Sequence, residues 1–447
     1  MPKEKKVDWF SIANELHLKY KGKIEVVPKV PVTKLKAFAI WYTPGVAGPC
    51  RKIFQEGKDL SFEYTVRWNY ALVISDGTRV LGLGNIGPEA GMPVMEGKAL
   101  LFKYLGGVDA IPLVVNEHDP DKFMYIVKAL EPSFGAVNLE DIESPKCFYI
   151  LEKLNEILDI PVWHDDQQGT ALVTLAGLIN ALKIVGKKLH EAKITLVGAG
   201  AANIATYKYL KIAGADPRKM LVVDSKGILH QHRKDMETLR KHNPWKYRIA
   251  LETNPEGKTG GIKEALEGAD VVIAASRPGP GVIRKEWIKA MANDPIVFAE
   301  ANPVPEIWPW EAKEAGARII ATGRSDFPNQ INNSLGFPAV FRGILTVRSR
   351  KMTDSMFIAA AEALVKYAEQ KGIHEEYIIP AMEEAEAYVM EAIAVAEKAM
   401  EEGVARRKIS RSELEQEVRE LIMRPRKYME VALREGLITI ESPYPVD

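Results

Sequence analysis

The fold of this chain is indicated most clearly by the stretch KITLVGAGAANIATYKYLKIAGADPRKMLVVD, residues 193–224. The apolar run KITLV leads into the turn Gly198-Ala-Gly200, a periodic helical segment follows, and a second apolar run ends at Asp224. This order predicts a βαβ unit of the dinucleotide-binding type. The first glycine permits the tight turn, and the second lets a pyrophosphate approach the backbone at the helix N-terminus.

The same stretch leaves the choice of dinucleotide open. Asn203 stands where the pattern usually has a third Gly or Ala, which weakens the match. Asp224 favours NAD because its carboxylate can accept both ribose hydroxyls and repels a 2′-phosphate, whereas Ser225 and Lys226 together could hold that phosphate. We therefore expect NAD or NADP, bound by Gly198, Gly200, Ala201, Ala202, Asn203, Asp224, Ser225 and Lys226.

Around this unit the chain divides into three expected regions. From about 166 to 340, short apolar runs alternate with helical patterns, namely ITLV, MLVV, DVVIAA, PIVFA and ARIIA. Such alternation predicts an α/β fold with a Rossmann-type, doubly wound parallel sheet. Residues 1–165 mix helical and short β patterns and predict an α/β domain of their own. Residues 341–447 are expected to form a helical region that serves packing or dimer formation, with helices over 354–371 and 381–402 and a capping box at Ser410 and Glu413.

A second glycine pattern, at Gly82, Gly84 and Gly87, matches the dinucleotide motif letter for letter. It follows ALVI-SDGT-RVL, which predicts a β-hairpin, and it leads into Pro88 and further glycines and prolines rather than a clean helix. Asp109 precedes an apolar run, whereas a ribose-binding acid stands at the end of a strand. We therefore assign the cofactor to the turn at Gly198.

The composition argues against several classes of binding partner. Sixty basic residues balance sixty acidic ones among 447, so the global charge does not favour nucleic acid or an anionic membrane surface. No apolar stretch is long enough to span a bilayer, and the N-terminus lacks the apolar core of a signal peptide. Only Cys50 and Cys147 are present, without the spacing of a zinc site. We expect a cytoplasmic protein whose thiols pack, with a small molecule as its partner.

Two acidic pairs stand out in apolar surroundings. Glu140-Asp141 follows FGAVN, and Asp165-Asp166 follows PVWH. Acidic pairs are most often solvated surface, but here the neighbouring residues are apolar, and buried carboxylates need a cation. Oxygen ligands suit Mg²⁺ or Mn²⁺. His164 is interpreted as a packed residue rather than a ligand.

Seven segments in one order resemble the malic enzymes: YTPGVAGPC, SDGTRVLGLGNIGPEAGMPVMEGKALL, NLEDI, HDDQQGTA, VGAGAAN, FAEANPVPE and NQINNSLGFPAVFRG. The likeness runs from about Trp41 to Gly343 and more loosely beyond. It is to the compact bacterial and archaeal type, without an appended phosphotransacetylase-like region. The resemblance implies oxidative decarboxylation of L-malate to pyruvate and CO₂ through oxaloacetate and enolpyruvate, with reduction of NAD or NADP and with Mg²⁺ or Mn²⁺.

The resemblance also implies roles for single residues. Lys98 is the expected base that removes the hydroxyl proton, with Asp165 supporting it, and Tyr42 is the acid that protonates C3 of enolpyruvate. Arg79 is expected to bind a malate carboxylate. The remaining implied residues are the metal ligands Glu140, Asp141 and Asp166 and the substrate or nicotinamide asparagines Asn302 and Asn333. To act as a base near neutral pH, Lys98 needs a pKa about three units below that of a free lysine. Burial and a nearby divalent cation both lower the pKa of a lysine.

Two other functions stay open from the sequence. A malolactic-type enzyme would convert malate to lactate without net cofactor reduction. A catalytically silent nucleotide-binding sensor is a more distant alternative, because Tyr42, Lys98 and the three ligand positions are intact. A homodimer or higher homo-oligomer is expected, but the sequence does not indicate whether subunits share an active site.

Overall fold

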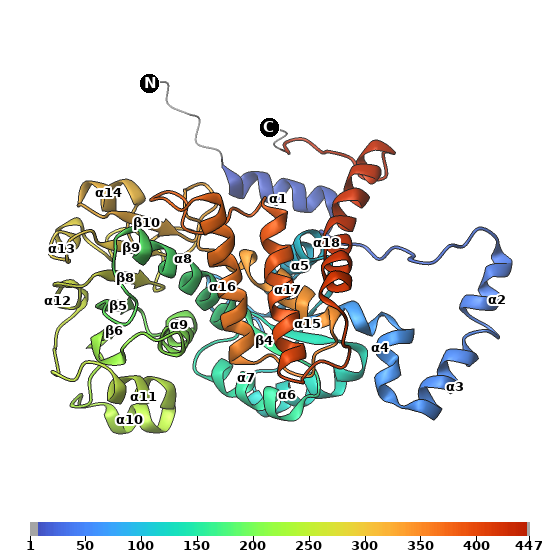
Figure 1. Cartoon of the computed structure of the whole chain (residues 1–447), viewed down its shortest axis with the longest axis horizontal. Helices are drawn as coiled ribbons and strands as arrows, with labels where there is room; N and C mark the ends of the chain where they lie inside the picture. Colours follow the sequence, from blue (N-terminus) through green and yellow to red (C-terminus); the bar gives the residue numbers. More distant parts are fainter. Residues whose placement is uncertain (1–7, 445–447) are drawn as a thin grey trace.

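The N-terminal half of the molecule contains a four-stranded parallel sheet. The computed structural model describes residues 8–444 (Figure 1), and its first sheet has the strand order β2-β1-β3-β4. The helices α5, α6 and α7 connect successive strands of this sheet, as parallel pairing requires. The bounds are β1 Tyr70–Ser75, α5 Pro88–Gly106, β2 Asp109–Val114, α6 Pro120–Leu130, β3 Ala136–Leu139, α7 Lys146–Ile157 and β4 Val162–His164.

The structure corrects the expectation of a hairpin before Gly82. ALVI lies in β1, which pairs in parallel with both β2 and β3, and only an isolated bridge joins Val80 to Gly84. A clean helix also follows, because α5 begins at Pro88 and continues through Pro93. Proline is well tolerated at the first helical position, where its missing N–H has no partner in any case. The glycine pattern therefore belongs to a second strand, loop and helix.

The second sheet has six strands in the order β10-β9-β8-β5-β6-β7. All five apolar runs expected as strands form its parallel part, and the short β7 adds an antiparallel edge next to β6. The expected α/β class with a Rossmann-type sheet is confirmed. The strands are β5 Ile194–Val197, β6 Met220–Asp224, β7 Gly227–Ile228, β8 Val271–Ala274, β9 Ile296–Ala299 and β10 Ile319–Thr322. The helices around them are α9 Ala201–Ile212, α10 Met236–His242, α11 Pro244–Glu252, α12 Ile262–Leu266, α13 Lys285–Ile288 and α14 Pro309–Glu314.

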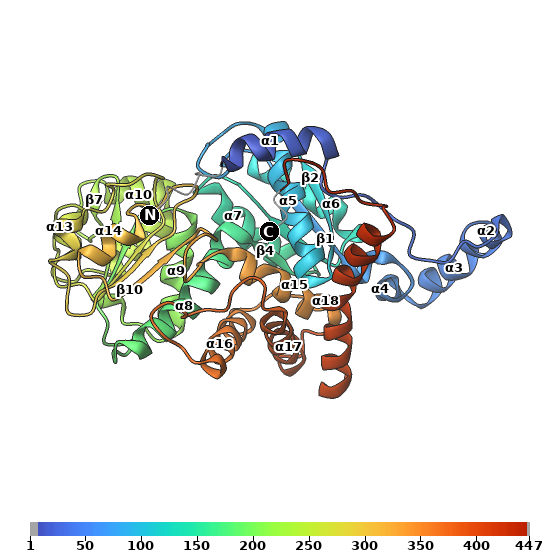
Figure 2. The same ribbon diagram turned by 90° about the horizontal axis from the view of Figure 1, so that it is seen from above.

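Helices join the two sheets and complete the core. The apolar helix α8 (Thr170–Ile184) packs against α9 and α16, and α15 (Phe337–Thr346) packs against α5 and α17. The expected helices are present as α16 (Asp354–Lys371) and α17 (Ala385–Glu401), and the capping box opens α18 (Arg411–Arg434). The C-terminal region therefore packs on the first sheet's helices (Figure 2). No helix in the described part of the chain has the length and apolar character needed to cross a bilayer.

The segment before β1 forms an arm. In Figures 1 and 2, residues 24–60 leave the body with α2 and α3 at their far end. None of these residues is buried, so Cys50, which we expected to pack, is exposed, whereas Cys147 is buried. The elements are α1 Trp9–Tyr20, η1 Leu35–Ala37, α2 Phe38–Trp41, α3 Ala47–Glu56, η2 Lys58–Leu60, α4 Ser61–Tyr64 and η3 Val66–Asn69.

Candidate active site

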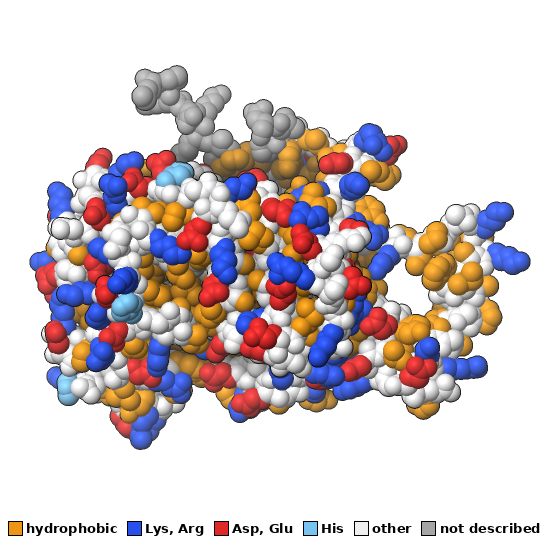
Figure 3. All heavy atoms as spheres, viewed as in Figure 1, with side chains coloured by type: hydrophobic (Ala, Val, Ile, Leu, Met, Phe, Trp, Pro, Cys, Tyr) orange, Lys and Arg blue, Asp and Glu red, His pale blue; other side chains and the backbone are white. Residues whose placement is uncertain are grey.

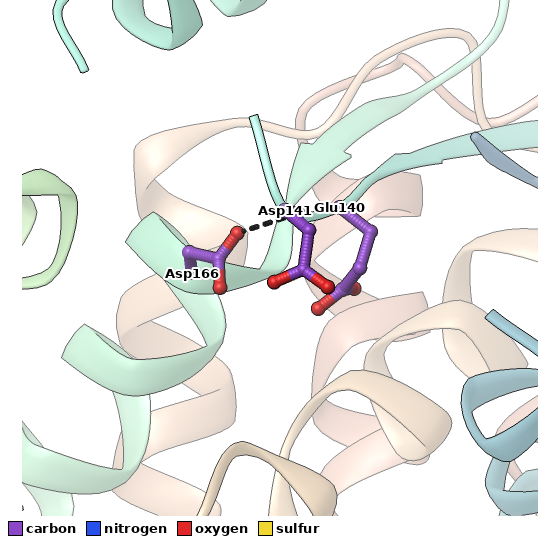
Figure 4. A group of neighbouring side chains, drawn as sticks. All are labelled: Glu140, Asp141 and Asp166. Atoms are coloured by element: carbon purple, nitrogen blue, oxygen red, sulfur yellow. Dashed lines mark hydrogen bonds between the residues drawn. The ribbon is translucent and has the colours of Figure 1, made fainter. Parts of the chain in front are cut away.

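Three carboxylates meet at one edge of the first sheet. Glu140 and Asp141 directly follow β3, and Asp166 follows the neighbouring strand β4 in the turn η5 (Asp165–Gly169). Because carboxyl ends of adjacent parallel strands lie side by side, residues 25 positions apart become neighbours. One oxygen from each carboxylate lies within 4.8 Å of the others, and Figure 4 shows the side chains pointing toward one another.

The backbone at Asp141 aims its carboxylate into this group. Its φ of 54° lies in the left-handed region, which aspartate adopts at a modest cost. The Asp141 N–H donates to Asp166 Oδ2 at 2.9 Å, and Asp141 Oδ1 accepts from the Leu81 N–H at 3.2 Å. The loop after β1 thereby joins the two acidic segments.

Lys98 reaches the same group from α5. Its side chain is 10% exposed, hydrogen-bonds Asp165, and lies 3.3 Å from Glu140 Oε1. The Lys98 ammonium also lies 4.6 Å from the centre of the Phe337 ring. Asp165 is fully buried and accepts a hydrogen bond from Trp163 Nε1 at 3.1 Å, which fixes its orientation. The residues expected to act as base and support are in direct contact.

The charges in this group do not balance. Burial raises the pKa of Glu140 well above its usual range, and repulsion from Asp165 and Asp166 adds to this effect against the attraction of Lys98. Burial also raises the pKa of Asp141 to about 7, with Asp166 adding to the shift. The pKa of Asp166 is shifted upward too, chiefly by burial. One buried ammonium, with the exposed guanidinium of Arg79 nearby, therefore faces four carboxylates, and the site is short of positive charge.

The donor set fits a hard divalent cation. Asp141 Oδ2 and Asn138 Oδ1 are buried and have no hydrogen-bond partner, which is costly for oxygen atoms unless a cation or water meets them. Three carboxylate oxygens at this spacing match the ligands that Mg²⁺ and Mn²⁺ prefer, and they leave coordination positions for a substrate. His164 is fully buried with no partner for either ring nitrogen, and burial lowers its pKa to about 4. This environment agrees with its interpretation as a packed residue.

The structure changes the electrostatic argument for Lys98. Burial acts to lower its pKa, as we expected, but Asp165 and Glu140 outweigh burial, and the net shift is upward. In the group as it stands, Lys98 is an ammonium ion. The carboxylates that hold its proton include one of the expected metal ligands, Glu140.

The expected substrate residues lie around this group at different depths. Asn333 is beside η5, since a Cβ on Gly169 would lie 2.9 Å from Asn333 Cβ and would overlap the Asp165 carboxylate. Arg79 is exposed next to the acidic cluster, where its guanidinium donates to Leu81 O and its backbone N–H to Asp141 O. Asn302 is exposed on the loop after β9, and its backbone oxygen lies near Gly82 of the first sheet's loop.

Tyr42 is the expected residue that this fold does not bring to the group. It directly follows α2, which lies far out on the arm in both views. Its side chain is 69% exposed.

The turn at Gly198 has the geometry of a nucleotide site. Gly198 has φ +99°, and a Cβ there would lie 2.5 Å from Ala275 O, so the position requires glycine. Gly200 caps α9, with open space where its Cβ would be, and Ala201 and Ala202 begin the helix. Asn203 donates to Val197 O at 2.9 Å and Gly198 O at 3.0 Å. Asn203, which departs from the sequence pattern, therefore stabilises the turn through these two hydrogen bonds.

Asp224, at the end of β6, already forms ion pairs with two basic side chains. Its Oδ1 accepts from Arg233 Nη1 at 3.0 Å, and its Oδ2 lies 3.6 Å from Lys246 Nζ. The Lys226 backbone N–H also donates to Asp224, while the Lys226 and Ser225 side chains are exposed beside it. The position expected to bind the ribose therefore combines one carboxylate with several positive charges.

Family models match both halves of the chain. The model described as "Malic enzyme, N-terminal domain" matches residues 21–119 and 116–155, and "Malic enzyme, NAD binding domain" matches residues 167–400. The chain belongs to the malic enzyme family. These matches include Lys98, Glu140, Asp141 and the Gly198 turn, while Asp165 and Asp166 lie between the two matched ranges.

Malic enzymes that are similar to this chain include both NAD-dependent and NADP-dependent ones. The chain is 47% identical over 409 residues to the bifunctional malic/malolactic enzyme of Bacillus subtilis (92% of this chain, 97% of the relative). It is 48% identical to the NAD-dependent enzyme of Geobacillus stearothermophilus (86% and 78%) and 44% identical to the NADP-dependent enzyme of Escherichia coli (87% and 52%). The crystal structure of Entamoeba histolytica malic enzyme superposes with a TM-score of 0.93 at 46% identity, covering 98% of this chain and 90% of that one.

Sequence reasoning missed two basic residues beside Asp224, the residue expected to bind the ribose of the cofactor. Arg233 and Lys246 stand 9 and 22 positions after Asp224, in a segment rich in basic residues that we did not interpret. The bracketing of Arg233 by Asp224 and Asp235, which both pair with it, is the signal that could have indicated an ion-pair network.

Proposed function

We propose that this chain catalyses the oxidative decarboxylation of L-malate to pyruvate and CO₂, with NAD or NADP as hydride acceptor. The observation that carries the proposal is the buried Lys98, in contact with Asp165 and Glu140 at the edge where Glu140, Asp141 and Asp166 converge. A buried amine among carboxylates, beside a nucleotide-binding fold, suits removal of a hydroxyl proton as hydride leaves the same carbon.

Lys98 takes the hydroxyl proton of C2 when it is a neutral amine. Asp165 holds the lysine nitrogen in place through their hydrogen bond, and the packing of Trp163 keeps Asp165 fixed. Once Glu140 shares its charge with a bound cation, less of that charge remains to hold the proton on Lys98. Glu140, Asp141 and Asp166 would hold Mg²⁺ or Mn²⁺, whose positive charge stabilises the negative charge that develops on the C2 oxygen during loss of CO₂.

The remaining residues orient the substrate and complete the reaction. The Arg79 guanidinium, exposed and bonded only to a backbone carbonyl, is free to turn toward a malate carboxylate and bind it in a bidentate manner. Asn333 and Asn302 flank the group from η7 (Asn333–Leu335) and the loop after β9 and would donate amide hydrogen bonds. Tyr42 would return a proton to C3 of enolpyruvate, which requires a tyrosine hydroxyl to reach this group.

Both NAD and NADP are proposed as cofactors of this chain. Asp224 supports binding of a ribose diol, while Arg233, Lys246 and Lys226 supply positive charge for a 2′-phosphate. We propose that the chain accepts both. We further propose that it works in the cytoplasm, since an exposed, unpaired Cys50 suits a reducing compartment. We also propose that it forms a homo-oligomer.

An initial-rate assay tests the main proposal. Malate is supplied with NAD⁺ or NADP⁺, with Mn²⁺ or with chelator, and both reduced cofactor and pyruvate are measured. We expect both products in equal amounts and only with Mn²⁺. Lys98→Ala should abolish them, whereas Lys103→Ala, further along α5, should not. Absence of cofactor reduction by the wild type with Mn²⁺, with NAD⁺ and with NADP⁺ alike, would refute the proposal.

One relative supports a second candidate. The Bacillus subtilis protein is named a bifunctional malic/malolactic enzyme, so conversion of malate to lactate is also proposed for this chain. The same site would then pass hydride back to pyruvate before the products leave. Lactate formed from malate with a catalytic amount of NAD⁺ would demonstrate this activity, and its absence alongside steady pyruvate formation would exclude it.

A further inference from the structure

Arg324 lies in the turn after β10 and binds the loop after β9. Its Nη1 donates to Pro303 O at 2.7 Å, so its guanidinium contacts the residue that directly follows Asn302. Asp326 binds the same guanidinium through two hydrogen bonds, from Nε at 2.8 Å and from Nη2 at 2.6 Å. The turn after β10 is thereby joined to the loop that carries Asn302.

The guanidinium of Arg324 is occupied by these contacts, unlike that of Arg79. Each of its three nitrogen atoms makes a hydrogen bond, and the carboxylate of Asp326 offsets its charge. Its carbon atom lies 5.8 Å from the ring centres of Trp308 and Phe327. A planar guanidinium that is both paired in a bidentate manner and stacked on aromatic rings is held in one orientation. Arg324 is therefore suited to holding the backbone in place rather than to binding a substrate anion.

The neighbouring Gly323 brings the same turn against the Asn302 amide itself. A Cβ on Gly323 would lie 2.5 Å from Asn302 Nδ2, so a side chain there would displace that amide. Gly323 O also accepts a hydrogen bond from Asn332 Nδ2 at 3.1 Å. Asn332 is the N-cap residue of η7, which begins at Asn333. The turn after β10 therefore contacts both asparagines' segments, one expected at the nicotinamide and one beside the acidic group.

The residue before Asn302 is held in a similar way by Glu306. This carboxylate is fully buried and accepts from the Ala301 N–H at 3.1 Å. It also accepts from the backbone N–H of Ser276 at 2.8 Å and from its hydroxyl at 3.0 Å, which joins the loop after β8 to the loop after β9. Asn302 thus lies between two anchored residues, with Glu306 holding position 301 and Arg324 holding position 303.

We propose that Arg324 is a positioning residue that holds Asn302 against the nicotinamide and so sets the distance from malate C2 to the ring. This inference rests on the proposed function, in which the Asn302 amide donates a hydrogen bond. Ligands of open α/β sheets bind beyond the carboxyl ends of the strands, where these loops lie. A misplacement of about 1 Å can slow a reaction by ~10²-fold, so a loosened loop should slow hydride transfer. The acidic group belongs to the other sheet and should be unaffected.

Arg318 provides a matched control. It directly precedes β10 and pairs with Glu375 at 2.6 Å, and the two side chains are 52% and 47% exposed. Figure 3 shows basic and acidic side chains interspersed over one face of the molecule, so exposed pairs of this kind are common in this protein. Such a pair contributes at most ~1 kcal/mol. Arg318→Gln therefore removes an arginine beside the same strand without affecting the loop after β9.

Two reactions of one protein test the inference. Malate oxidation is measured at saturating cofactor with Mn²⁺, and decarboxylation of added oxaloacetate is measured with Mn²⁺ and without cofactor. Arg324→Gln should lower malate oxidation by ~10²-fold and keep oxaloacetate decarboxylation close to the wild-type rate. Arg324→Lys, which can still donate to Pro303 O, should recover part of the loss, and Arg318→Gln should change neither reaction. An Arg324→Gln protein that loses both reactions equally, or neither, would overturn the inference.

Hydrogen exchange gives a readout that does not depend on activity. In the cofactor-free protein, backbone amides of residues 300–308 should exchange faster in Arg324→Gln than in the wild type, because the loop has lost one of its two anchors. Amides of residues 136–142, around β3, should exchange at the wild-type rate, which shows that the variant is folded. An unchanged rate over residues 300–308 would overturn the inference. A wild type that does not oxidise malate would instead refute the proposed function, and this is recognised before any variant is compared.

Discussion

Replacing Asp141 with asparagine should stabilise the metal-free protein while removing most of its response to metal. Asp141 is 2% exposed, and burial together with Asp166 raises its pKa from 3.8 to about 7. A shift of about three units corresponds to ~4 kcal/mol of folding free energy, as an upper estimate. The substituted asparagine would keep the size and the oxygen that accepts from Leu81 but carry no charge.

The direction of the pH dependence follows from the raised pKa. Between about pH 4 and pH 7 the folded metal-free protein binds a proton at Asp141 that the unfolded chain has released, so stability falls as pH rises through this window. Above about pH 7, the ionised Asp141 carboxylate destabilises the folded protein by its full amount. The Asp141→Asn protein lacks this component and should lose less stability across the same window.

Urea unfolding at pH 5 and pH 8, with chelator and with Mn²⁺, measures both effects. At pH 8 without metal, the variant should be more stable than the wild type, and Mn²⁺ should stabilise the wild type far more than the variant. Glu300→Gln is the matched control, because burial raises the pKa of Glu300 to about 8 at a site outside the carboxylate group. This control should keep the full response to Mn²⁺. A variant less stable than the wild type at pH 8 without metal, or equally stabilised by Mn²⁺, would refute the reasoning.

Three further outcomes are expected. Lys98→Ala should lower turnover by ~10²–10⁴-fold while leaving cofactor affinity unchanged in fluorescence titration, with Lys103→Ala as control; a small change in turnover would remove Lys98 as the base. Arg233→Ala should weaken NADP binding about tenfold and leave NAD binding unchanged or tighter, because it frees Asp224 for the ribose diol; equal losses for both cofactors would assign Arg233 a purely structural role. Gly198→Ala should abolish binding of both cofactors, since its Cβ would overlap the neighbouring backbone; retained binding would contradict the observed turn.

The sequence alone predicts those parts of the molecule whose structure is determined by short stretches of neighbouring residues. Each expected strand of the second sheet is a run of apolar residues that must be buried on both faces, and such runs need no distant partner to be recognised. The acidic group was predictable for a related reason. Glu140 and Asp166 each follow an apolar strand, and parallel strands bring their carboxyl ends to one edge.

The features that were missed depend on residues far apart in the chain. One of them is the proton-holding effect of Asp165 and Glu140 on Lys98 in the absence of a cation, because these carboxylates lie 67 and 42 positions away from it. The engagement of Asp224 by Lys246 arises from helix α11, which has no pattern that predicts its placement. The ion pair at the C-terminal end of the arm is a further example, because Asp59 pairs with Arg350, nearly three hundred positions later.

The second glycine pattern shows why a motif needs its neighbours. Gly82 lies against loops of the second sheet in this fold. A Cβ at Gly82 would lie 2.9 Å from Pro278 Cγ and 3.1 Å from Asn302 O, both on loops of the second sheet. The glycine therefore serves the same physical need as Gly200, close approach of backbone, but its partner is the other half of the protein. Because the same loop also binds Asp141 through Leu81, the contact at Gly82 links the loop after β9 to the carboxylates, and we expect a side chain there to separate the proposed cofactor and malate sites without disturbing either sheet.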